Sequence, residues 1–320
     1  MVTADGSSTL SPGMADFNDA SVYSPQISLT GNFIVVSSNA EGQATMVFQP
    51  PTAAQITLTF DLFFVSPEEI FFVEIDTATT SNPFPRLSGK MILQDPTTQF
   101  NDTVLRGSGV VTGTGLAGAN STVFAGLLAS SLGNGSATLS YTQNDAGTVT
   151  TNSLSGNYQV QQNGRVGFTN LGSRLTAAYL IGPNEGFIIG SDSAATYGLL
   201  EQQIGAPYSL ASVQGSYVLL APKEADASVV HMIGQLNSTG SGTISGTLDE
   251  FIPPSTPATD LTFSGTYTVA SDGSGRLTPG LINGFPANLV FYVVSPSRVR
   301  MIPTDPNLAD SQPQVIFLNH

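Results

Sequence analysis

A pattern that occurs three times, at intervals about as long as a small domain, is the feature that most constrains this fold. Its most complete copy lies between Phe263 and Asp305 and combines a Gly-x-Tyr strand, a polar turn, an apolar strand and a Ser-Pro break. The anchoring glycines are Gly31, Gly156 and Gly265, which lie 125 and 109 residues apart. The 320 residues therefore predict three tandem units, each with its own core.

The segments between the turns favour strands almost everywhere. Short apolar or alternating runs are separated by polar turn residues, and 33 glycines and 20 prolines punctuate the chain. This pattern predicts an all-β protein. In the third unit the predicted strands are residues 213–220, 228–236, 242–249, 261–270, 275–278, 287–294, 298–303 and 314–318. Only Leu116 to Leu132 is rich enough in Ala and Leu for a short helix to compete with a strand.

Eight sequential strands with mostly short connections favour a closed up-and-down β-barrel, because closure removes the exposed strand edges. A two-sheet sandwich satisfies the same pattern. We divide the chain into an incomplete barrel unit at residues 1–100, a second unit at 101–206 and a third at 207–320.

The first unit lacks strands that the other two contain. Residues 4–13 align with the turn and third strand of the third unit, at 238–246. The first strand and nearly all of the second therefore have no counterpart. Missing strands would leave unpaired N–H and C=O groups and an apolar slot, so we expect something to fill the gap.

The composition excludes several classes of partner. Charged residues make up 10% of the chain and the net charge is −14, so nucleic acid and anionic membranes would be repelled. No apolar run approaches the ~18 residues of a membrane-spanning helix, which excludes membrane insertion of that kind. The chain has no Cys, and therefore no disulfide and no thiolate ligand or nucleophile. Its Ser, Thr, Asn and Gln content is typical of an extracellular or cell-surface protein.

The residues that could support catalysis do not form a recognisable site. The two histidines are His231, in an apolar strand, and His320, the last residue; no Gly-x-Ser-x-Gly elbow accompanies them. Three carboxylate pairs could serve a glycosidase: Asp16 with Asp19, Glu68 with Glu69, and Asp249 with Glu250. Glu68 and Glu69 follow Pro67 in a predicted hairpin tip, which favours a solvated turn. We therefore expect no enzyme activity.

Cofactor binding is not indicated either. Turn carboxylates could bind Ca²⁺, although they also cap turns, and no calcium-loop motif surrounds them. These residues are Asp5, Asp16, Asp19 and Asp272. The segment Asp272 to Gly275 leads into a strand, so it predicts a hairpin turn and no phosphate site.

Aromatic residues are concentrated in the first unit. The candidates for an interface are Phe60, Phe63, Phe64, Phe71 and Phe72. Contiguous pairs of Phe place rings on both faces of their strands. One face fills the core, and the other would be exposed unless another domain or subunit covers it.

Two motifs of the third unit resemble a known kind of repeat. Gly240 to Asp249 and Gly265 to Gly275 combine Gly-x-Gly-x-Ile and Asp-Gly-x-Gly turns with a Gly-x-Tyr strand. The pattern is similar to tandem repeats in large secreted or surface proteins of soil bacteria, particularly Acidobacteria. The second unit departs from it with Asn163-Gly164 for the Asp-Gly turn. The resemblance implies a β-repeat fold and a surface setting, with no catalytic residues to transfer.

The sequence therefore predicts a non-enzymatic structural protein that self-associates, as a filament or a surface layer. We expect subunits to join by strand addition into the incomplete first unit. The alternative is an extracellular binding module that holds a small apolar ligand in a barrel or grips a glycan on an outer face.

Overall fold

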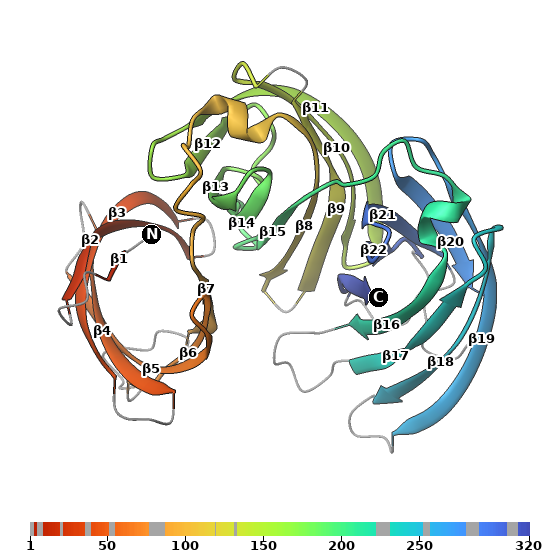
Figure 1. The fold of residues 1–320 in the computed structure, drawn as a ribbon, viewed down its shortest axis with the longest axis horizontal. Helices are drawn as coiled ribbons and strands as arrows, with labels where there is room; N and C mark the ends of the chain where they lie inside the picture. The colour runs from red at the N-terminus through yellow and green to blue at the C-terminus, as the bar shows by residue number, and fades with distance from the viewer. Residues whose placement is uncertain are drawn as a thin grey trace. The chain divides into compact units, whose positions relative to one another are not determined.

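A computed structural model of the chain shows an all-β molecule (Figure 1). It describes residues 3–4, 9–19, 22–35, 40–50, 55–76, 87–118, 120–130, 133–221, 231–251, 257–279, 288–305 and 313–320. These residues form strands and two short 3₁₀ helices, with no α-helix among them. The chain divides into two compact units, Met1–Thr98 and Gln99–His320, which are described separately.

The first unit is a seven-stranded antiparallel sheet in simple sequential order, from β1 to β7. Its strands are β1 (Thr3–Ala4), β2 (Thr9–Asp19), β3 (Val22–Val35), β4 (Glu41–Gln49), β5 (Ile56–Ser66), β6 (Glu69–Glu74) and β7 (Ser88–Ile92). The sheet curls on itself in Figure 1, but β1 and β7 are not paired, so it stays open. Leu29, Ala44, Met46, Leu58, Phe60 and Leu62 form its buried core.

The compact unit Gln99–His320 contains two closed eight-stranded barrels. The second barrel follows the 3₁₀ helix η1 (Asp102–Leu105). Its strands are β8 (Gly107–Ala117), β9 (Asn120–Ser130), β10 (Ser136–Asp145), β11 (Thr148–Val160), β12 (Arg165–Thr169), β13 (Ala177–Gly182), β14 (Glu185–Ile189) and β15 (Tyr197–Gln202). It closes where β15 pairs with β8.

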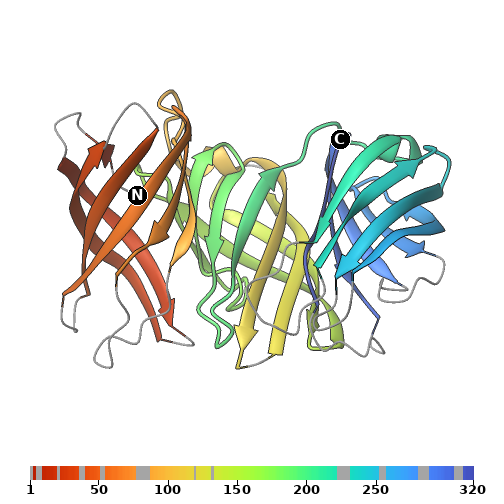
Figure 2. The ribbon, with the colours of Figure 1, turned by 90° about the horizontal axis from the view of Figure 1, so that it is seen from below.

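The third barrel has the same plan and follows η2 (Leu210–Val213). Its strands are β16 (Gly215–Ala221), β17 (His231–Ser238), β18 (Thr243–Phe251), β19 (Ala258–Val269), β20 (Ser274–Pro279), β21 (Leu289–Ser295), β22 (Arg298–Pro303) and β23 (Ile316–Asn319). It closes where β23 pairs with β16. The strands of each unit run obliquely beside one another (Figure 2), as closure of a barrel requires.

These barrels confirm the predicted all-β fold and exclude the sandwich. Each of the eight strands predicted in the third unit overlaps one observed strand. The Ala-rich and Leu-rich stretch that could have formed a helix contains β9, a strand buried along most of its length. The two 3₁₀ helices were not predicted.

The repeated glycines have one physical reason in common. At Gly31, Gly156 and Gly265 an added Cβ would collide with a backbone oxygen of the neighbouring strand. The oxygens belong to Thr45, Thr169 and Thr278, at 2.2, 2.2 and 2.5 Å from the Cβ position. Any side chain would push the strands apart, so β3 of the first unit and the fourth strand of each closed barrel need glycine at this point.

A tyrosine two residues after this glycine helps to close each barrel. The Tyr158 hydroxyl donates to the carbonyl of Asp102 in η1, at 2.9 Å. The Tyr267 hydroxyl donates to the carbonyl of Leu210 in η2, also at 2.9 Å, and accepts from the Ser238 hydroxyl. The same interaction thus ties the 3₁₀ helix across the end of both barrels.

Candidate functional site

The interior of the open first unit is the candidate functional site. It contains a cavity of about 270 Å³. The side chains around it are mostly apolar: Leu10, Phe33, Ala44, Met46, Leu62, Phe64, Pro67, Glu68, Ile70, Met91, Ile92 and Leu93. A cavity of this size and lining in a sheet interior is an empty place for apolar side chains or for a small apolar ligand.

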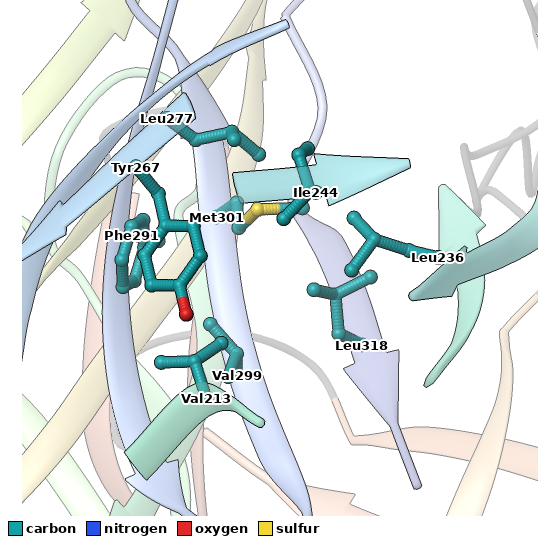
Figure 3. A pocket seen from close by; sticks show the side chains of 9 residues that line it. All are labelled: Val213, Leu236, Ile244, Tyr267, Leu277, Phe291, Val299, Met301 and Leu318. Atoms are coloured by element: carbon teal, nitrogen blue, oxygen red, sulfur yellow. The ribbon is translucent and has the colours of Figure 1, made fainter. Parts of the chain in front are cut away.

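The third barrel shows what fills the same place when the barrel is closed (Figure 3). Its central cavity measures about 10 Å³, which is hardly room for one water molecule. Strand registers match six lining residues of the two cavities: Leu10 with Ile244, Phe33 with Tyr267, Ala44 with Leu277, Leu62 with Phe291, Ile70 with Val299, and Met91 with Leu318. The third barrel adds Val213 from η2 and Leu236 from β17. Neither has a counterpart among the described residues of the first unit.

The residue at position 33 suits a unit that lacks these parts of the closed barrel. It occupies the place of Tyr267, whose hydroxyl bonds to η2 and to the end of β17. The described first unit has no counterpart of η2, and Ala4 of β1, a residue without a hydroxyl, stands at the register position of Ser238. A tyrosine at position 33 would bring a polar hydroxyl into an apolar slot without these partners, and phenylalanine avoids that cost.

The open sheet also leaves strand edges without partners. β1 covers β2 only at Leu10 and Ser11. No described strand pairs with the outer edge of β7, whereas the corresponding β23 pairs with β16 in the third barrel. An edge of this kind offers N–H and C=O groups to an incoming strand. The cavity of the first unit, called the slot below, therefore lies in the same sheet as the unpaired strand edges, as the sequence predicted.

The five phenylalanines proposed for an interface separate into two groups. Phe60 is buried, and its ring packs edge-on against Phe72 with centroids 5.4 Å apart. Phe64 is partly buried against the same core and lines the slot. Phe63 and Phe71 face each other across β5 and β6 on the outer face and are 45% and 47% exposed.

Inside the compact unit Gln99–His320, the two barrels pack through their outer faces. β21 contacts β8 and β9, and β22 contacts β9 and β10 (Figure 1). This apolar contact consists of Val110, Val123, Ala125 and Leu127 from the second barrel and Val290, Tyr292, Val294, Ile302, Val315 and Phe317 from the third. Burial raises the pKa of the Tyr292 hydroxyl, and its hydrogen bond with Thr142 opposes that shift.

A buried ion pair stands beside this contact and was missed by sequence reasoning. The Arg300 guanidinium donates to both carboxylate oxygens of Glu201, at 2.6 and 2.7 Å. Arg298 approaches the same carboxylate at 3.4 Å. Because only nine Lys and Arg occur in the chain, two of them alternating along the apolar strand 298–303 were an available signal of a buried acidic partner.

The residues considered for catalysis are scattered. Glu68 is exposed at a turn, and Glu69 forms an ion pair with Lys90 at 3.5 Å. Asp249 accepts a hydrogen bond from the backbone N–H of Asp260. His231 is exposed on β17, so it does not line the barrel interior. His320 stacks edge-on against Tyr217.

The turn carboxylates considered for Ca²⁺ serve local bonds. Asp16 accepts from the backbone N–H of Gln26, and Asp272 accepts from the N–H and hydroxyl of Ser274. Asp5 and the side chain of Asp19 lie outside the described residues. In the part of the chain that is described, no three His, Asp or Glu side chains gather as a metal site would require.

The described helices include none with the length and apolar character of a membrane span. The fold and the site together define a tandem β-barrel protein with an open first unit. Comparisons with models of protein families, with curated proteins and with solved structures found no match to this chain.

Proposed function

We propose that the chain is a non-enzymatic, extracellular structural protein that assembles with its own copies through the open first unit. The observation that carries the proposal is the apolar slot of about 270 Å³ beside unpaired strand edges. A strand added to β7 would receive backbone hydrogen bonds and place alternate apolar side chains in the slot. The surface setting expected from the composition and from the resemblance to bacterial tandem repeats belongs to this proposal.

The candidate donor is the first unit of a second copy. All strands of the second and third barrels are paired on both sides in closed sheets. The outer edges of β1 and β7 have no strand partner among the described residues. Pairing between first units therefore uses edges that are already exposed, and it requires no closed barrel to open.

Mass in solution tests this proposal. We expect light scattering to give a mass that rises with concentration, and negative-stain images to show filaments or layers. A synthetic peptide with the sequence of residues 213–221, which contains β16, should occupy the slot and lower the mass. A scrambled peptide is the matched control. A monomer at every concentration contradicts the proposal.

A ligand-binding role is the second candidate, and the apolar lining of the same slot favours it. The cavity lies just under the usual ~300–1,000 Å³ of small-molecule pockets. If the protein stays monomeric but a fluorescent apolar probe binds with one-to-one stoichiometry, and Ala44→Leu abolishes that binding, the slot is a ligand site. The exposed Phe63 and Phe71 pair would be the place to test for a glycan.

A further inference from the structure

The contact between the second and third barrels joins two different faces. The second barrel uses the outer face of β8 and β9, and the third barrel uses the outer face of β21 and β22. Such a contact is heterologous, so each participant retains the face that the other one used. All three units repeat the same strands, and the retained faces can therefore be located by register.

The third barrel retains the face formed by β16, β17 and the end of β18. Val110 pairs across the sheet with Glu201 and Leu127, and Val218 pairs in the same way with Asn319 and Gln235. Val110 and Val218 are therefore equivalent, yet the first is 0% exposed and the second 56%. We call Val218, Leu220, Ile233 and Phe251 the third-barrel free face; all four are exposed.

The first unit presents the opposite face, on β5 and β6. Phe63 pairs with Phe71 just as Tyr292 pairs with Arg300, in both cases shortly before a Ser-Pro turn. We call Phe63, Val65, Phe71 and Val73 the first-unit free face. Its equivalents in the third barrel are Tyr292, Val294, Arg300 and Ile302, which are all buried against the second barrel.

The two charges of the Arg300–Glu201 ion pair are absent from the equivalent positions of both free faces. Inside the chain, Arg300 is held by Glu201 across the contact. On the free faces, Phe71 replaces Arg300 and Asn319 replaces Glu201. Docking the two free faces would therefore bury no unpaired charge at this point, which would otherwise be costly.

We propose that the third-barrel free face of one copy binds the first-unit free face of another, in the arrangement that already joins the second barrel to the third. The occupant is a second copy because its first-unit free face has the required strand positions and is apolar and exposed. Repeated head to tail, this heterologous contact gives a closed ring if the rotation between copies closes, and an open-ended filament if it does not. It rests on the proposed function in that both require self-association, but it uses a different surface from the slot.

Cross-linking locates the contact. Thr142 bonds to Tyr292 inside the chain, and their equivalents are Asp249 and Phe63. The chain contains no Cys, so Asp249→Cys and Phe63→Cys can be made in separate batches, mixed and treated with a short bismaleimide. We expect a heterodimer as the main product. Thr243→Cys, exposed on the same strand but away from the face, is the matched control and should give at least about tenfold less product.

Mass measurements complete the test. Ile233→Glu and Phe71→Glu should each weaken association at least about tenfold, because each places a charge in an apolar contact. Thr243→Glu should leave it unchanged. If mass still rises with concentration in both Glu variants and no cross-link forms, this inference fails and slot-based assembly stands. If the cross-link forms but the β16 peptide has no effect on mass, strand addition fails and the face contact stands.

Discussion

The open first unit and the closed third barrel share the same order of strands but differ in how their interiors are filled. The third barrel fills its centre with Val213 and Leu236, which have no counterpart among the described residues of the first unit, and its cavity measures about 10 Å³. The first unit keeps about 270 Å³. One repeat can therefore form a closed barrel with a filled centre or an open sheet with an apolar cavity, according to which strands it contains.

The outer faces of the two units also differ, because one is covered and the other is exposed. Tyr292 and Arg300 are buried against another barrel, while Phe63 and Phe71 remain exposed at the same strand positions. A barrel face that is apolar and uncovered is unusual on a monomer. Three experiments test this comparison between the two units.

The largest effect is expected at the buried ion pair. Arg300→Met leaves the buried Glu201 carboxylate with only the 3.4 Å contact to Arg298, and should lower the free energy of unfolding by about 3 kcal/mol. Phe71→Met, at the equivalent exposed position, should change it by no more than about 0.5 kcal/mol. Urea unfolding followed by tyrosine fluorescence measures the Arg300 variant, because eight of the nine Tyr lie in Gln99–His320, and hydrogen exchange of β5 and β6 measures the Phe71 variant.

The double variant provides the control for this experiment. Glu201→Leu with Arg300→Met removes both charges and should cost less than the sum of the single changes. Equal losses for Arg300→Met and Phe71→Met would contradict the equivalence of a covered and an uncovered face.

A smaller effect is expected at the tyrosine that closes the barrel. Tyr267→Phe removes hydrogen bonds to the Leu210 carbonyl and the Ser238 hydroxyl, at a cost of about 1–3 kcal/mol. The reverse change, Phe33→Tyr, adds a hydroxyl to the open slot and should give no stabilisation. Hydrogen exchange of β3 and β19 measures both units in one sample. A stabilising Phe33→Tyr would show that the slot already contains a carbonyl or hydroxyl partner.

The smallest effect is expected from alkaline pH. Burial, with a further contribution from nearby Tyr267, raises the pKa of Tyr217 to about 12. The unfolded chain loses this proton near pH 10 and the folded barrel only near 12, so the stabilisation is complete below pH 10 and declines above it. At pH 11 the loss is about 1 kcal/mol.

The measurement is the dependence of urea stability on pH from 9 to 12. Tyr217→Phe should reduce the slope over this range, even though it also removes the bond to the Pro296 carbonyl. Tyr23 is the only tyrosine of Met1–Thr98, so hydrogen exchange of the first unit should depend less on pH in this range. An unchanged slope in the variant would assign the alkaline sensitivity to other groups.

Much of the fold was determined by the sequence itself. Strand periodicity, turn residues and the spacing of Gly31, Gly156 and Gly265 predicted the tandem β units and the missing strands, because these signals depend on neighbours close in the chain. The alternation along β5 and β6 also predicted that some phenylalanines would point outward. Closure as a barrel, rather than a sandwich, was one of two alternatives until the registers were known.

The tertiary structure decided which outer faces are covered. Val110 and Val218 stand at equivalent places in the repeat, and no local pattern separates them, yet one is buried and the other exposed. The partner of Arg300 lies 99 residues away, and the 3₁₀ helices are fixed by a tyrosine that reaches across the barrel. These outcomes depend on contacts between side chains far apart in sequence, and such contacts exist only once each sheet has closed or stayed open.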